Sequence, residues 1–185
     1  MSLIVDIIVS RDLVQLVADN VKNSKVVPST LNGIRGFVDS ALDSVGRNKM
    51  AVWKETTLPT PDKISVLRIW SHGYTHWIGG GDINDGNVIF GKDNLKADNI
   101  EKFSTDLRVL TPYFANPARV ELRGCAAAKG SGQKMMLSLA KIWGVDVHGS
   151  DKEQSLVTLW QPPVYVATKD GNWGTTAGVE VYEGR

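Results

Sequence analysis

Apolar residues in the first seventy positions predict two main strands and two helices, besides a short strand over 50–53. Residues 3–9 form a short run dominated by Ile and Val, which is typical of a strand buried on both faces. Apolar residues recur at helical spacing over 11–22 and over 31–45, and Gly46 is suited to end the second helix. Residues 64–70 give the clearest strand signal in the chain.

Strand and helix signals continue to alternate through the rest of the chain. Asp98 and Glu101 resemble the start of a helix whose apolar stripe runs to Leu110 and ends before Pro112. The remaining predicted elements are a short strand over 50–53, a small hairpin ending at 88–90, a strand from about 119 whose tip presents Cys125, a helix over 133–143 closed by Gly144, a strand over 145–151, and two strand-like pieces over 164–168 and 179–182. This order predicts an α/β fold with a mainly parallel central sheet and helices on both faces, with the tail pairing at an edge or packing over the site.

Length, charge and cysteine content narrow the class of protein. The 185 residues, 42% of them hydrophobic, suffice for a substantial core, and we expect a single domain over 1–185. A net charge of +1 gives no support to a nucleic-acid or membrane partner recruited by charge. No run approaches the roughly 18 apolar residues of a membrane span, and residues 1–9 lack the features of a secretory signal. The single cysteine favours a reducing compartment, so we expect a cytoplasmic protein or an effector exported by a leaderless route.

Two strand ends carry the candidate chemistry. The strand over 64–70 runs into Ser-His-Gly, with His72 and Gly73, and Cys125 follows a glycine at the tip of a later strand. Adjacent parallel strands would bring His72 and Cys125 to one sheet edge, where open α/β sheets bind ligands. Histidine has the pKa needed to favour a thiolate near neutrality, which makes Cys125 the candidate nucleophile and His72 its base. The backbone amides of Gly73 and Cys125 are then expected to stabilise an oxyanion.

Three further polar residues are candidate substrate contacts. Arg123 precedes the cysteine by two positions and either binds an acidic substrate group or covers the sheet. Asp151 either lines a pocket for a basic side chain or caps the next turn. His148, expected at another strand tip, lines the pocket or acts as a rival base. No cofactor or metal is predicted, because His72 and His76 have the spacing of a helical zinc pair but follow a strand.

These motifs resemble the caspase-like cysteine peptidases, the group of caspases, gingipains, clostripain, legumain and separase. The resemblance extends from Ile64 to Asp151 and is closest to an uncharacterised caspase-like domain of large bacterial surface and repeat proteins. It implies a three-layer caspase-like fold and a peptidase acting on peptide or protein substrates. It also implies His72 as general base and acid, Cys125 as nucleophile and Gly73 as oxyanion donor. The Gln-Ala-Cys-x-Gly segment of true caspases is replaced here by Arg-Gly-Cys-Ala-Ala, so the resemblance does not imply aspartate specificity.

Two other functions are compatible with the same residues. One is a catalytically silent module of the same fold that binds a peptide, in which Cys125 is only a small packed side chain. The other is a cysteine amidase or transferase acting on small acyl compounds, because a thiol nucleophile serves all acyl transfer. The rate at which Cys125 reacts with an alkylating agent, and its dependence on His72, would separate the silent module from the enzymes.

Overall fold

The computed structural model describes residues 2–21, 23–29, 32–47, 62–72, 86–152 and 163–176. Strands and helices alternate along these ranges. In chain order they are β1 (Ser2–Ile8), the 3₁₀ turn η1 (Arg11–Leu13), α1 (Val14–Asn20), β2 (Lys25–Pro28), α2 (Gly33–Ser44), β3 (Lys63–Trp70), β4 (Val88–Phe90), β5 (Asp93–Leu95), α4 (Ile100–Arg108), the 3₁₀ turn η2 (Thr111–Tyr113), β6 (Phe114–Leu122), α5 (Gly132–Trp143), β7 (Asp146–Ser150), β8 (Val164–Ala167) and β9 (Trp173–Thr175).

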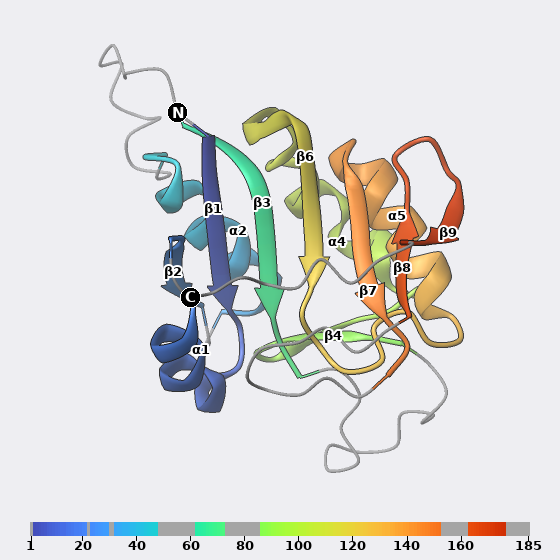
Figure 1. Ribbon diagram of the computed structural model, residues 1–185, viewed down its shortest axis with the longest axis horizontal. Helices are drawn as coiled ribbons and strands as arrows, with labels where there is room; N and C mark the ends of the chain where they lie inside the picture. The colour runs from blue at the N-terminus through green and yellow to red at the C-terminus, as the bar shows by residue number, and fades with distance from the viewer. Residues whose placement is uncertain are drawn as a thin grey trace.

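The central feature is a seven-stranded sheet, formed within the described ranges in the order β2-β1-β3-β6-β7-β8-β9. All pairs from β2 to β7 are parallel, whereas β8 and β9 add antiparallel strands at one edge. The prediction of an α/β fold with a mainly parallel central sheet is therefore confirmed, and so is a tail that pairs at an edge. Because β1, β3, β6 and β7 run in the same direction, their carboxyl ends all lie on the same side of the sheet, at the bottom of Figure 1.

Helices lie on both faces of the sheet, but unequally. Alternate residues of the central strands, among them Val5, Ile7, Leu67 and Ile69, belong to the main core, which α2, α4 and α5 also line. On the opposite face, Ile8 packs with side chains of α1 in a smaller cluster. Figure 1 shows α2, α4 and α5 behind the sheet and α1 in front of it, near the end of β1.

Helix α5 shows how the apolar spacing produces this packing. Five residues recur at intervals of one, three and four along it and are all buried against the sheet: Met135, Met136, Leu139, Ile142 and Trp143. The helix ends at Gly144, whose φ of 68° is the left-handed conformation that glycine adopts without steric cost. Gly46 ends α2 in the same way, with a φ of 74°. No helix in the described part of the chain is long and apolar enough to cross a membrane.

The hairpin and one helix start differ from prediction. The segment 88–90 opens the hairpin rather than closing it, because Gly91, with a φ of 55°, lets the chain turn back so that Phe90 pairs with Asp93. Phe90 packs against α2, with its ring centroid 4.9 Å from that of Phe37. Helix α4 begins after Asn99 rather than Asp98, so Glu101 is only two residues from the N-cap and the predicted capping box does not form. The Asn99 side chain instead accepts a hydrogen bond from the backbone of Lys96 at 2.9 Å.

Two edge strands have no counterpart in the prediction. Strand β2 is only four residues long and ends in Pro28, which an edge strand tolerates because one side of its backbone has no ladder to complete. Strand β9 lies in a segment with many turn-forming residues and pairs with β8. The strands predicted over 50–53 and 179–182 lie outside the described residues.

Strand β6 contains a local bulge far from its carboxyl end. Ile64 pairs with Phe114, but Val66, only two residues later, pairs with Arg119. Residues 115–118 therefore leave the ladder, and this bulge accommodates Pro117, which has no backbone N–H to contribute to a central strand. The bulge lies near the amino-terminal end of β6, at the opposite end of this strand from the candidate site.

Candidate active site

His72 lies two residues beyond the end of β3, and its backbone is held from two sides. Its N–H donates to Oγ of Ser10, a buried residue just past β1, at 3.1 Å. Its carbonyl accepts a hydrogen bond from the backbone of Ile89 in β4 at 3.3 Å. The imidazole is half-buried. Hydrogen bonds to Ser10, just past β1, and to Ile89 of the hairpin thus fix the backbone of His72 beyond the end of β3.

Cys125 lies at the same edge, beyond the adjacent parallel strand β6. In the β3–β6 register Ile69 pairs with Leu122, and the Arg123 N–H extends the ladder by donating to the Ile69 carbonyl at 2.8 Å. His72 is the third residue after Ile69, and Cys125 is the third residue after Leu122. The two candidate residues therefore leave neighbouring strands at equal distance from the last pair, and the thiol residue is partly exposed. The cysteine is not on the strand itself but opens the turn that follows it.

The turn that begins at Cys125 is fastened to the end of β7. Ala126 donates its N–H to the Lys152 carbonyl at 2.8 Å, and Ala128 donates to the Ser150 carbonyl at 2.9 Å. Ala126 has a φ of 53°, a left-handed conformation that costs a residue with a Cβ roughly 1–3 kcal/mol. Such strain persists only where surrounding contacts impose it, and here the two hydrogen bonds do so. The result is a fixed turn immediately after the candidate nucleophile.

Two glycines pack the chain against this turn. A Cβ on Gly132, the first residue of α5, would lie 2.1 Å from the Ala127 carbonyl oxygen, and one on Gly86 would lie 2.4 Å from the same atom. Gly86 also donates its N–H to the Lys129 carbonyl at 2.7 Å. The next residue, Asn87, is buried. It stands in the chain between Gly86, which contacts the cysteine turn, and Ile89, which donates its N–H to the His72 carbonyl. Its Oδ1 makes no hydrogen bond within the described part of the chain.

A row of three charged residues and a histidine, called the charged row below, crosses the sheet on the α1 face. Asp6, Arg68, Glu121 and His148 are register partners across β1, β3, β6 and β7. Asp6, Arg68 and Glu121 are almost completely buried. Arg68 bridges its neighbours, donating to Asp6 and to Glu121 at 3.2 Å each. Burial of these charges is tolerated because each has an oppositely charged partner within hydrogen-bond distance.

Glu121 is the centre of this network. Arg119 donates to its Oε1 at 2.8 Å, and Arg123 donates to its Oε2 through Nε at 2.9 Å and Nη2 at 2.5 Å. Burial alone raises the pKa of a carboxyl group, but the charges of Arg123 and Arg68 and the hydrogen bond from Arg119 outweigh it and lower the pKa of Glu121 to about 2. Arg123 also lies over the Trp70 ring, 5.8 Å from its centroid. Its side chain thus covers the sheet, the second of the two roles expected for it.

Asp151 lies beside the cysteine turn, between the two residues whose carbonyls hold that turn. Its Oδ2 accepts a hydrogen bond from the Tyr165 hydroxyl at 3.3 Å, and burial together with this carboxylate raises the pKa of Tyr165. Lys152 lies 3.9 Å from Oδ1, too far for a hydrogen bond. Asp151 Oδ1 is buried and accepts no hydrogen bond within the described residues. Asp151 therefore places a carboxylate oxygen that accepts no hydrogen bond from the described residues beside the cysteine turn.

His148 is not at a strand tip, and this expectation was wrong. It occupies the middle of β7, paired with Glu121 on one side and with Val166 of β8 on the other. The ladder with β8 continues to Ser150, so the strand extends two residues past the histidine. His148 therefore lies in the charged row, whereas Cys125 and His72 lie beyond the strand ends. Gly73 and His76 fall outside the described residues.

Comparison with known proteins places these residues in a recognised family. A family model described as a domain of unknown function, DUF4347, matches residues 47–156, which is more than half of the chain. The chain belongs to the DUF4347 family. The matched DUF4347 region contains both His72 and Cys125, together with Arg123, His148 and Asp151. A search of curated proteins finds no match.

Proposed function

We propose that this DUF4347 protein is a cysteine-dependent endopeptidase that uses Cys125 as nucleophile and His72 as general base and acid. The observation that supports the proposal most directly is the β3–β6 register, which sends both residues from equivalent positions of adjacent parallel strands to the ligand-binding edge of the sheet. The fixed, strained turn after Cys125 supports it further, because strained backbone clusters at functional sites.

In the proposed reaction the Cys125 sulfur attacks the carbonyl carbon of a peptide bond. His72 takes the thiol proton and delivers it to the leaving amine, so that the C–N bond breaks and a thioester forms. Water, deprotonated by His72, then attacks the thioester and returns the thiol. Backbone N–H groups at the strand ends, Gly73 among those expected, stabilise the negative oxygen that forms in each step.

The charges around Cys125 favour a substrate with a basic side chain. Arg123 is already bound twice by Glu121 and stacked on Trp70, so recruiting it to an acidic substrate would break a buried ion pair. Asp151, in contrast, has a buried oxygen that accepts no hydrogen bond from the described part of the chain, with Lys152 Nζ 3.9 Å away. A lysine or arginine side chain of the substrate would satisfy this oxygen with a charge-assisted hydrogen bond. Of the two alternatives that the sequence leaves open, we therefore propose the basic side chain.

The proposal is tested with a peptide library and three variants of the full chain. We expect hydrolysis after Lys or Arg, loss of turnover in Cys125→Ala, and a loss of about 10²–10⁴-fold in His72→Ala, the range for a positioned acid–base group. His148→Ala is the matched control, because His148 lies in mid-strand, and its loss is expected to be much smaller.

The same experiment separates the competing functions. Absence of turnover on peptides, with slow alkylation of Cys125 that is unaffected by His72→Ala, would identify a silent peptide-binding module. Turnover of small amides but not of peptides would identify an amidase or transferase. Comparable losses from His148→Ala and none from His72→Ala would overturn the assignment of the base.

A further inference from the structure

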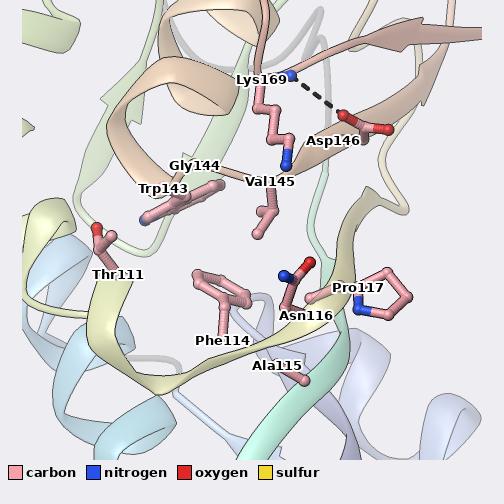
Figure 2. Close-up of a pocket in the computed structure, with 11 residues that line it drawn as sticks. Thr111, Phe114, Ala115, Asn116, Pro117, Trp143, Gly144, Val145, Asp146 and Lys169 are labelled. Atoms are coloured by element: carbon pink, nitrogen blue, oxygen red, sulfur yellow. Dashed lines mark hydrogen bonds between the residues drawn. The ribbon is translucent and has the colours of Figure 1, made fainter.

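A pocket of about 330 Å³ lies at the amino-terminal ends of β6 and β7, on the opposite side of the sheet's length from the candidate active site. It is formed where the β6 bulge over 115–118 meets the carboxyl-terminal end of α5 and the first residues of β7. Its volume is at the lower end of the range for small-molecule sites, which is about 300–1,000 Å³. Figure 2 shows the side chains that border it.

One part of the pocket is aromatic and apolar. Phe114 and Trp143 border it with their rings tilted at 54° and their centroids 6.2 Å apart, and Val145 lies beside them. Trp143 is held in place because its Nε1 donates to the Leu107 carbonyl at 3.0 Å. This wall is therefore pre-formed, and it suits a flat ring because a third aromatic group can pack against two tilted ones.

Two polar side chains extend into the open space of the pocket. Figure 2 shows the Lys169 side chain extending down toward Val145 and the Asn116 amide pointing up from the bulge. Within the described residues neither Lys169 Nζ nor the Asn116 amide makes a hydrogen bond. An ammonium and an amide N–H that converge on one space are both donors, and together they match the oxygens of a carboxylate.

The negative groups at the pocket are placed less favourably for a ligand. Asp146 uses Oδ1 to accept the backbone N–H of Lys169 at 3.1 Å, and Figure 2 shows its carboxylate directed away from the space between Lys169 and Asn116. The carboxyl-terminal end of α5 carries partial negative charge, but the Gly144 N–H and the Thr111 hydroxyl already bind its carbonyls. Lys169 thus supplies the positive charge at the open space, and the Asn116 amide supplies both a donor and an acceptor.

We propose that this pocket binds a small organic monocarboxylate that carries an aromatic ring. The ring packs against Phe114, Trp143 and Val145, and the carboxylate accepts hydrogen bonds from Lys169 and Asn116. The site is independent of the peptidase proposal, since it lies at the opposite end of β6 and α5 from Cys125.

The test is calorimetric titration of the full chain with phenylacetate, with amide chemical shifts recorded in parallel. We expect saturable binding with shifts at Gly144, Val145 and Lys169. Phenylacetamide, which is neutral, is expected to bind at least about tenfold more weakly because it cannot accept a charge-assisted hydrogen bond, and acetate at least about tenfold more weakly because it has no ring to bury.

Variants locate the binding groups. Lys169→Gln is expected to weaken phenylacetate binding about tenfold and Asn116→Ala severalfold, whereas the exposed Lys141→Gln on α5 and Cys125→Ala leave it unchanged. Because Lys169 and Asn116 are exposed, neither change should affect folding. Unchanged affinity in Lys169→Gln, shifts confined to other residues, or tighter binding of the cation 2-phenylethylamine would each overturn the proposal.

Discussion

The location of Cys125 and His72 at one end of the sheet could be predicted from sequence, because each follows a predicted strand and parallel neighbours end on the same side. The same reasoning misplaced His148, because the end of β7 depends on its pairing with β8, which lies far along the chain. Asn87 and Ser10 were not singled out, since nothing in their local sequence shows that the fold buries them beside His72. The sequence therefore predicts which reactive residues follow the strands. The residues that distant segments place beside them can be identified only from the folded structure.

The choice of Asp151 as the recognition group predicts a specific change in selectivity. In Asp151→Asn the buried oxygen becomes an amide oxygen without charge, so the preference for Lys and Arg over neutral residues should fall about tenfold or more. The measurement is the ratio of kcat/KM for matched peptides with Arg or Gln before the scissile bond. Glu101→Gln, an exposed change on α4, is the control. An unchanged ratio would show that Asp151 does not contact the substrate.

At the scale of elements, the apolar runs predicted the strands that make up the parallel core, and Gly46 and Gly144 marked helix ends correctly. The hairpin was misjudged because its turn is formed by Gly91 rather than by the glycines that precede it. The spacing of apolar residues did not reveal that Gly86, just before the hairpin, and Gly132, the first residue of α5, pack against the turn after Cys125. These glycines are needed because that turn's carbonyls approach too closely for a side chain.

Gly132→Ala is therefore expected to damage both stability and activity. The added Cβ would overlap the Ala127 carbonyl, so the turn after Cys125 must shift, at a cost of about 1–3 kcal/mol in the free energy of unfolding. Turnover should fall further than stability alone explains, because the nucleophile moves with its turn. Denaturant unfolding and kinetics of the same preparation measure the two effects. Gly174→Ala in β9, where a Cβ meets nothing within 4 Å, is the matched control, and equal effects would refute the argument.

At the scale of the whole molecule, the buried charges link three central strands, β1, β3 and β6, on the face opposite the main core. Sequence predicted a strand buried on both faces at β1 but not that Asp6 within it would pair with Arg68 of β3. Three of these residues, Asp6, Arg68 and Glu121, occupy central strands and are nearly inaccessible, so the network depends on the register of the entire sheet. Such a network stabilises the fold only while Glu121 remains ionised.

Stability should consequently fall in acid over a defined range. The pKa of Glu121 is lowered on folding from 4.5 to about 2, so its contribution is fully present above pH 4.5 and is lost as the pH falls toward 2. A shift of this size corresponds to about 3 kcal/mol. Denaturant unfolding between pH 7 and pH 2.5 measures this loss. In Arg119→Gln one partner of the carboxyl is removed and its folded-state pKa rises toward 4.5, so the loss of stability in acid should be smaller and should level off at a higher pH than in the unaltered protein. Arg35→Gln, on the exposed side of α2, should leave the profile in place. Identical profiles for the unaltered protein and Arg119→Gln would mean that Glu121 does not control acid stability.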